Sequence, residues 1–185
     1  MTFELQPQLQ NALIRLEPLG KGDFEALYAV AADPLIWEQH PAKDRYKREV
    51  FENFFKGAME SGGAFRIHDA VSGALIGSSR YYEYDESLRK ISIGYTFLAR
   101  SHWASGHNRA LKTLMLDHAF RFVDHVHFQV GVENWRSRKA MEKLGGVYVG
   151  EEPVSYFGEA AKPNVIFEIH AADWAAAKKK TNPVP

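Results

Sequence analysis

Cysteine is absent from this chain of 185 residues. Without thiols the protein has no disulfide, no thiolate-ligated metal site and no cysteine nucleophile. The sequence also lacks a run of 18 apolar residues, which excludes a membrane-spanning helix. Its first ten residues lack the basic and then apolar pattern of a secretory signal. These absences predict a cytoplasmic protein with no membrane partner.

An excess of charge of either sign is also missing, because 23 Lys and Arg residues balance 23 Asp and Glu residues. A chain without net charge is not drawn to nucleic acid or to an anionic surface. No basic stripe with interleaved aromatic residues is present either. Nucleic acid is therefore not expected as a partner, and an anionic ligand must be held by a local arrangement of residues.

The hydrophobic pattern of the chain predicts both helices and strands. The length and the 45% hydrophobic content fit one domain, residues 1–185. Apolar residues recur at helical spacing in four segments, residues 24–31, 51–59, 109–123 and 134–144. Apolar and polar residues alternate, as in strands, in seven segments, residues 13–16, 65–67, 75–84, 90–98, 126–132, 147–150 and 165–170.

The order of these segments predicts an α/β (α+β) fold, with one mixed, mostly antiparallel sheet of about seven strands and about four flanking helices. Short turns between residues 65 and 98 favour an antiparallel meander. The strand, helix and strand between residues 90 and 132 form a crossover unit, so strands 90–98 and 126–132 are expected to be parallel. Residues 171–185 are expected to be a frayed, solvated tail with one helical turn.

The loop at residues 103–110 joins a predicted strand to a predicted helix. Its small residues allow backbone N–H groups to point outward, and together with the helix dipole they suit a phosphate or pyrophosphate. It is not a nucleoside-triphosphate loop, because no Gly-Lys-Ser/Thr follows. By composition alone, an ordinary strand-to-helix loop is the favoured interpretation.

Two motifs in this region resemble the GNAT superfamily of acyl-CoA-dependent N-acetyltransferases. They lie within residues 93–108 and 134–145, and residues 116–120 match between them. Within the superfamily, the sequence is most similar to the ribosomal-protein N-terminal acetyltransferase branch. The resemblance covers nearly the whole chain, because it extends to residues 16–19, 33–37 and 173–174.

The resemblance implies the GNAT fold, in which the parallel fourth and fifth strands splay apart. It also implies transfer of an acetyl group from acetyl-CoA to a primary amine by direct attack in a ternary complex, with coenzyme A as the product. The acceptor is expected to be a protein N-terminus or a small-molecule amine. The family further favours a homodimer.

The same resemblance implies a binding site for acetyl-CoA. The pyrophosphate is expected on the loop that matches the family's Gln/Arg-x-x-Gly-x-Gly/Ala pattern, with Gly106 as its central glycine. A backbone N–H of Phe97 or Leu98 is expected to stabilise the oxyanion. Asn134, which also suits a helix N-cap, is expected to bond the pantetheine. The complete cofactor set is Phe97, Leu98, Trp103, Ala104, Ser105, Gly106, His107, Asn108, Arg109, Asn134 and Ser137.

Proton transfer is where the sequence departs from the family. Many relatives carry a glutamate two residues before a glycine of the fourth strand, and this chain has Ser92 there. The reaction can then rely on water, on an amine that is already neutral, or on another residue as the base. Glu83 and His170 are the candidate residues, although both also suit surface or structural roles. Ser137 is the candidate general acid for the departing thiolate. Glu83 and Ser137 are thus the predicted catalytic residues.

The acceptor site is expected at aromatic residues and two variable loops, residues 36–46 and 151–164. Trp37, Tyr81 and Tyr156 are the predicted acceptor residues, although core packing also explains aromatic side chains. No metal site is expected, because His118, His125 and His127 lack zinc-motif spacing. The missing acid at Ser92 also allows a catalytically degenerate acyl-CoA-binding sensor or interaction module.

Overall fold

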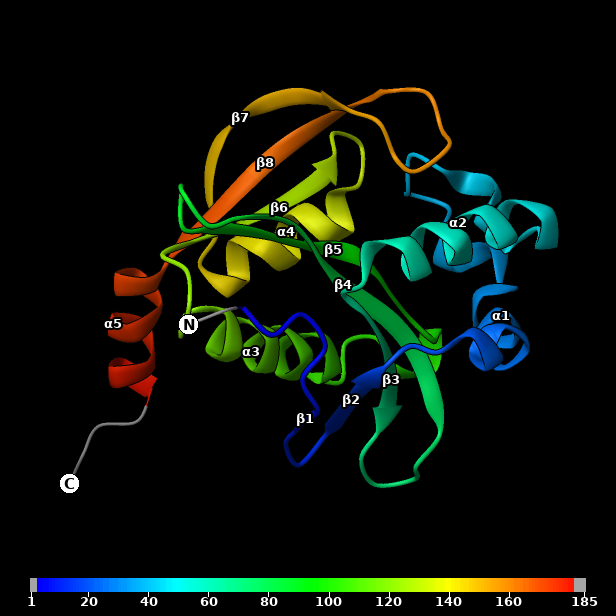
Figure 1. The fold of residues 1–185 in the computed structure, drawn as a ribbon, viewed down its shortest axis with the longest axis horizontal. Helices are drawn as coiled ribbons and strands as arrows, with labels where there is room; N and C mark the ends of the chain where they lie inside the picture. The colour runs from blue at the N-terminus through cyan, green and yellow to red at the C-terminus, as the bar shows by residue number, and fades with distance from the viewer. Residues whose placement is uncertain (1–2, 182–185) are drawn as a thin grey trace.

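The computed structural model describes residues 3–181, whose eight strands form one sheet in the order β1-β2-β3-β4-β5-β6-β8-β7 (Figure 1). Only β5 and β6 pair in parallel, and every other neighbouring pair is antiparallel. The predicted α/β fold is confirmed, with the short β1 as the additional strand. The strands are β1 Leu9–Gln10, β2 Ile14–Pro18, β3 Ala64–Asp69, β4 Leu75–Asp85, β5 Lys90–Leu98, β6 His125–Gly131, β7 Val147–Val154 and β8 Lys162–His170.

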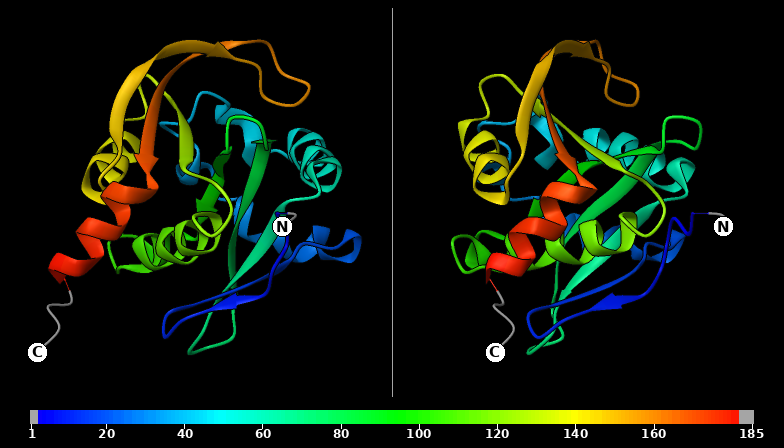
Figure 2. Two further views of the ribbon diagram at one scale, coloured as in Figure 1. Left: turned by 60° about the vertical axis from the view of Figure 1, so that its left-hand side comes forward. Right: turned by 90° about the vertical axis from the view of Figure 1, so that its left-hand side faces the viewer.

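Five helices flank the sheet within these residues, and none of them is long and apolar enough to cross a membrane. Figure 2 (left) shows α2 on one side of β4 and β5 and α3 on the other. Short 3₁₀ turns connect some elements, among them η1 Lys21–Asp23, η3 Lys43–Tyr46 and η4 Arg100–His102. The helices are α1 Phe24–Ala31, α2 Arg48–Ser61, α3 His107–Ala119, α4 Trp135–Leu144 and α5 Ala171–Thr181.

The predicted frayed tail is wrong for residues 171–181, which form α5. Trp174 is 8% exposed and belongs to the main apolar cluster, and its indole donates to Asp117 Oδ1 at 2.8 Å. Burial of one large aromatic side chain and its satisfied N–H anchor the helix. Residues 182–185 of the expected tail lie outside the described residues.

Two apolar clusters hold the layers together on opposite sides of the sheet. One joins the sheet to α3, α4 and α5 through residues such as Leu111 and Met141. The other packs α1 and α2 on the opposite side through residues such as Leu27 and Phe51. In α2 the apolar residues recur at helical spacing, which is why this helix buries one face.

Strands β5 and β6 are neighbours for only part of their length. Their parallel pairing covers three residues of β5, Lys90 to Ser92. Further along, the pairing of β5 with β4 shifts register, and Tyr95 has a φ of 52°. This irregularity turns β5 with β4, whereas β6 stays paired with β8 as far as Gly131. The two parallel strands therefore splay apart at their carboxyl ends, as predicted.

We expect Gly77→Ala to destabilise the fold by about 1–3 kcal/mol, the usual result of overpacking. A Cβ at Gly77 would lie 2.0 Å from the carbonyl oxygen of Phe97, so β4 could not stay against the end of β5. Urea unfolding measures the difference. Gly22→Ala is the control, because nothing lies within 4 Å of its added Cβ. Equal unfolding midpoints for both variants would contradict the close approach of the two strands.

Candidate active site

A cavity of about 550 Å³ lies between the carboxyl end of β5, the loop that follows it, the start of α3 and α4. Five cationic side chains line it, and no Asp or Glu among the described residues does. A chain with zero net charge thus gathers positive charge around one space. We call this space the cationic cavity, after Arg109, Lys112, Arg136, Lys139 and Lys143.

The start of α3 adds backbone donors to this cavity. No side chain caps the helix, so the amides of its first turn have no acceptor within it. Both Ala104 (φ 57°) and Gly106 (φ 86°) adopt the left-handed conformation that bends the loop in front of the helix. Uncapped amides and the positive end of the helix dipole favour an anion here. The structure therefore supports the predicted anion loop.

Most residues of the predicted cofactor set meet at this cavity. Ser105 and His107 do not line it, and His107 is buried against Asp69, with 2.9 Å between Nε2 and Oδ2. Trp103 lies in the cavity wall beneath Arg136, whose guanidinium is 4.0 Å from the ring centre. The lining members are Phe97, Leu98, Trp103, Ala104, Gly106, Asn108, Arg109, Asn134 and Ser137.

One of the two predicted oxyanion donors faces away from β4. The Ala99 amide donates to the Ile76 carbonyl of β4 at 2.7 Å, so the alternation of an antiparallel pair turns the peptide groups of Leu98 outward. The Leu98 carbonyl accordingly accepts a 2.9 Å hydrogen bond from the Trp103 indole. The Phe97 amide faces β4 by the same alternation. Leu98 is therefore the available backbone donor.

Asn134 and Ser137 lie together at the start of α4. The Asn134 side chain accepts the Ser137 amide at 3.2 Å and so caps the helix. Its amide nitrogen and the Ser137 hydroxyl have no partner within residues 3–181. Both groups line the cationic cavity and are free to contact a ligand.

Glu83, the other predicted catalytic residue, lies on the exposed part of β4 and does not line the cationic cavity. Its carboxylate accepts hydrogen bonds from Ser92 Oγ at 2.9 Å and from Gln129 Nε2 at 3.1 Å. A carboxylate is thus held directly beside the strand position where the sequence lacks one.

A second cavity, of about 860 Å³, adjoins the cationic cavity, because His40 lines both. It lies between the two loops that the sequence predicts to bind the acceptor. Two lysines also line it, and burial beside the Arg45 guanidinium holds the pKa of His40 well below its usual value. We call it the acidic cavity, after the carboxylates of Glu38, Asp44, Glu133 and Glu159.

The three predicted acceptor residues occupy different places. Trp37 lines the cationic cavity, and Tyr156 packs on His40 with 5.5 Å between ring centres. Burial raises the pKa of Tyr156 to about 12. Tyr81 lies in the main core, fully buried, with its hydroxyl bonded to the Met115 carbonyl at 2.5 Å. Tyr81 therefore belongs to the core rather than to the acceptor site, because it lines neither cavity.

Four cations of the cavity wall were not predicted from the sequence. Arg136, Lys139 and Lys143 are spaced at i, i+3 and i+7 on α4, so they share one face, and this spacing is visible in the sequence. Lys112 follows the apolar Leu111 in α3, and nothing in the pattern distinguishes it from a surface lysine.

Lys112 is a buried cation without a carboxylate partner. It is 3% exposed, and its ammonium donates to Thr96 Oγ1 at 2.6 Å, its only hydrogen bond among the described residues. Burial lowers the pKa of Lys112 from 10.5 to about 7. A buried amine with such a pKa, in the wall of a cavity, is typical of a functional site.

The sequence matches the family model of an acetyltransferase (GNAT) domain over residues 14–147. Because this match spans more than half of the chain, the protein belongs to the GNAT acetyltransferase family. The resemblance seen in the sequence motifs is thereby confirmed at the level of the family. None of the curated proteins compared with the sequence matches it significantly.

Solved GNAT structures share the fold. A GCN5-related N-acetyltransferase from Brucella melitensis superposes with a TM-score of 0.80 at 20% identity, covering 96% of this chain and 85% of that one. Spermidine N-acetyltransferase from Vibrio cholerae, in complex with CoA and spermine, gives 0.68 at 19%, covering 89% and 99%. Mycobacterium smegmatis RimJ, in complex with CoA-disulfide, gives 0.67 at 19%, covering 93% of each chain.

We expect Lys112→Met to change how stability depends on pH. The folded-state pKa lies below the unfolded value, so the folded protein binds fewer protons between pH 7 and 10.5 and its stability rises with pH there. Between pH 7 and 9 the wild type should gain about 2 kcal/mol over the variant. Urea unfolding at both pH values measures this.

Lys56→Met is the matched control, because Lys56 lies on the exposed face of α2. It should leave the pH dependence as in the wild type. Parallel stability profiles for the wild type and Lys112→Met would show that the Lys112 ammonium is not destabilised by burial.

Proposed function

We propose that this protein transfers an acetyl group from acetyl-CoA to a cationic primary amine. One observation carries the proposal: the cationic cavity and the acidic cavity adjoin at His40. CoA is an anion with a pyrophosphate and a further phosphate, whereas a primary amine is an ammonium ion at neutral pH. Opposite charges on neighbouring walls suit these two substrates.

The CoA portion is assigned to the cationic cavity. The uncapped amides at the start of α3 would bind the pyrophosphate, and Arg109, Lys139 and Lys143 would neutralise phosphate charge. The relatives from Vibrio cholerae and Mycobacterium smegmatis, which are complexes with CoA and CoA-disulfide, support this assignment. The pantetheine would extend along β5, where Leu98 and Asn134 offer N–H donors.

The transfer needs a donor for the oxyanion and a proton for the leaving thiolate. The amine nitrogen attacks the thioester carbonyl carbon, a C–N bond forms, and the carbonyl oxygen becomes negative. The Leu98 amide is the proposed donor to that oxygen. When the C–S bond breaks, the unpaired Ser137 hydroxyl donates a proton to the sulfur, and the nitrogen, now part of an amide, releases its second proton to the Ser137 oxygen, which restores the hydroxyl. Attack by the amine therefore uses Leu98 of β5, and departure of the thiolate uses Ser137 of α4, which follows β6.

The attacking nitrogen must first lose a proton, and Glu83 is the proposed acceptor. Its carboxylate lies 2.9 Å from Ser92 Oγ, on the strand next to the position that is acidic in many relatives. A water molecule in the chain of hydrogen bonds from Glu83 would carry the proton, because Glu83 itself does not line the cationic cavity.

The acceptor is assigned to the acidic cavity. Of its carboxylates, Glu133 makes no ion pair among the described residues, and it would attract an ammonium group. Two acceptor classes fit: a protein N-terminus, as in the ribosomal-protein branch that the motifs resemble, and a small polyamine, as in the relative named spermidine N-acetyltransferase. Both are cationic, so the geometry supports cationic over neutral acceptors.

A thiol-release assay tests the proposal directly. Acetyl-CoA is mixed with a panel of acceptors: peptides with free N-termini, polyamines and neutral alcohols. We expect thiol release with at least one amine and none with the alcohols. Binding of CoA without turnover on any amine would instead favour the catalytically degenerate binding module.

Gly106→Asp should lower the affinity for CoA at least a hundredfold, because it places a carboxylate in the anion loop. Calorimetry with CoA measures this. Gly106→Asn separates charge from backbone strain, since it has the same shape without the charge and should bind more tightly than the aspartate variant. Gly62→Asp is a second control, at a left-handed glycine outside both cavities. Unchanged binding in Gly106→Asp would show that the loop does not hold the phosphates.

Ser137→Ala and Glu83→Gln should lower kcat about a hundredfold, the lower range for loss of an acid or base. The Kd for CoA should stay within threefold of the wild type, because neither substitution removes a cation. For Glu83→Gln, the remaining activity should rise with pH, as hydroxide replaces the base. A change in Kd without a change in kcat would assign these residues to binding alone.

A further inference from the structure

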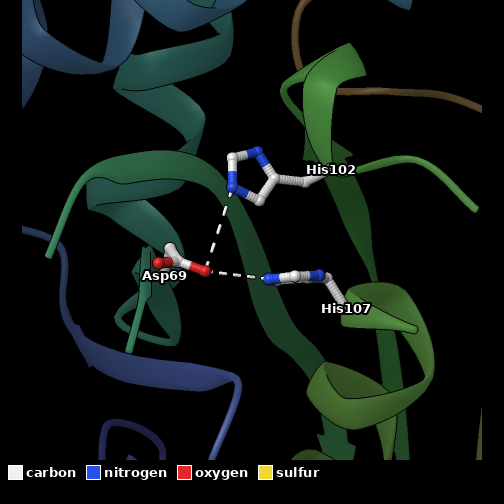
Figure 3. A group of neighbouring side chains, drawn as sticks. All are labelled: Asp69, His102 and His107. Carbon is white, nitrogen blue, oxygen red and sulfur yellow. Dashed lines mark hydrogen bonds and ion pairs between the residues drawn. The ribbon is translucent and has the colours of Figure 1, made fainter. Parts of the chain in front are cut away.

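A cluster of two histidines and one aspartate adjoins the proposed CoA site, because His102 also lines the cationic cavity whereas Asp69 and His107 do not (Figure 3). Asp69 ends β3, His102 ends the 3₁₀ turn η4, and His107 begins α3. Asp69 Oδ2 lies 2.9 Å from His107 Nε2 and 3.9 Å from His102 Nε2. The three atoms are within 4.8 Å of one another, and both rings point Nε2 at the same carboxylate oxygen.

Hydrogen bonds fix the protonation of His107 at its other nitrogen. The single hydroxyl proton of Ser105 is donated to the His102 carbonyl at 2.7 Å. Ser105 Oγ, 2.8 Å from His107 Nδ1, can then only accept, so Nδ1 carries the proton. The lone pair of Nε2 therefore faces a carboxylate oxygen at 2.9 Å. Two lone pairs at this distance repel unless a cation or a second proton lies between them.

Hydrogen bonds also orient His102 and Asp69, at the atoms that face away from the cluster. His102 Nδ1 is 2.9 Å from Ser101 Oγ, which leaves Nε2 for the cluster. Asp69 Oδ1 accepts the Ser72 amide at 2.6 Å and the Ser72 hydroxyl at 2.7 Å, which leaves Oδ2 for the cluster. The hydrogen bonds from Ser72 hold the pKa of Asp69 well below its usual value. Metal-binding histidines are oriented in this way, with the remote ring nitrogen held by a hydrogen bond.

We propose that Asp69, His102 and His107 bind a divalent transition-metal ion of the zinc type. Two imidazole nitrogens and one carboxylate oxygen suit Zn²⁺, whereas Mg²⁺ and Ca²⁺ prefer oxygen ligands. Tetrahedral zinc with these ligands requires donor atoms about 3.3 Å apart. The separations from Asp69 Oδ2, 2.9 Å and 3.9 Å, bracket that value, and the two histidine nitrogens lie within 4.8 Å of each other. Side-chain movements of about 1–1.5 Å, mainly of His102, would therefore close the site.

A metal ion at this position would hold the loop between η4 and α3 in place. His102 and His107 stand at the two ends of the short loop that contains Ala104 and Gly106, and Asp69 belongs to a different strand. A metal ion bound to all three ties both ends of this loop to the end of β3. The loop that presents the α3 amides would then be held in its observed conformation, so metal binding should raise the thermal stability of the protein.

A second pair of histidines on a carboxylate provides a matched control. His125 Nδ1 and His127 Nε2 contact Glu168, but at its two different oxygens, 3.3 Å and 2.8 Å away. The donors therefore do not converge on one point. This group has the same residue types as the proposed site, two histidines and one carboxylate, but its histidines do not contact the same carboxylate oxygen.

Calorimetric titration of the whole, chelator-treated protein with Zn²⁺ tests the proposal, in the absence of CoA so that the result is independent of acetyl transfer. We expect one saturable Zn²⁺ per chain. Asp69→Asn and His102→Ala should each weaken binding at least tenfold, and His127→Gln should leave it unchanged. Zn²⁺ should raise the melting temperature of the wild type but not of His102→Ala.

His102→Ala keeps the contact between His107 and Asp69, so it separates a metal site from a simple ion pair. Circular dichroism of each variant without metal verifies its fold. The absence of saturable Zn²⁺ binding to the wild type would show that the cluster is an ion pair only. Loss of binding in His127→Gln equal to that in His102→Ala would assign the metal to surface histidines and overturn the proposal.

Discussion

The pairing of β5 is the constraint on which the site depends. A strand has two hydrogen-bonding edges, and β5 uses one of them for β4 along almost its whole length. The irregularity at Tyr95 turns β5 with β4, so its other edge loses β6 after Ser92. Peptide groups such as those of Leu98 are left without a strand partner, and the space beside them becomes the cationic cavity.

The fold separates positive and negative side chains into two neighbouring cavities, although the chain has no net charge. The whole chain is neutral, yet α3 and α4 direct five cations at one cavity, and three loops direct four carboxylates at the next, with Glu133 in the loop between β6 and α4. Burial works against this positive charge at Lys112, whose ammonium has no carboxylate partner and whose pKa is lowered to about 7. A neutral protein can thus have neighbouring cavities of opposite charge, which its net charge does not reveal.

Features that depend on neighbouring residues were predicted well from the sequence, whereas features that depend on tertiary contacts were not. The anion loop and the Asn134 cap are set by neighbouring residues, and most of the predicted cofactor set lines one cavity. Tyr81 failed because aromatic composition does not say which face of a strand points inward, and it lies on the core side of β4. Lys112 was missed because its side chain is buried by tertiary packing, and its hydrogen-bond partner Thr96 belongs to a different element, β5.

By itself, the sequence determined the class of fold, the parallel strands at residues 90–98 and 126–132 and the family, and it predicted the anion loop. Hydrophobic period, turn residues and short motifs are encoded over a few neighbouring positions, so they can be read along the chain. Only the tertiary structure decided which charges share a cavity, that Glu83 lies beside Ser92, and that Asp69 meets two histidines. These contacts join segments far apart in the chain, and their distances depend on how the strands and helices pack.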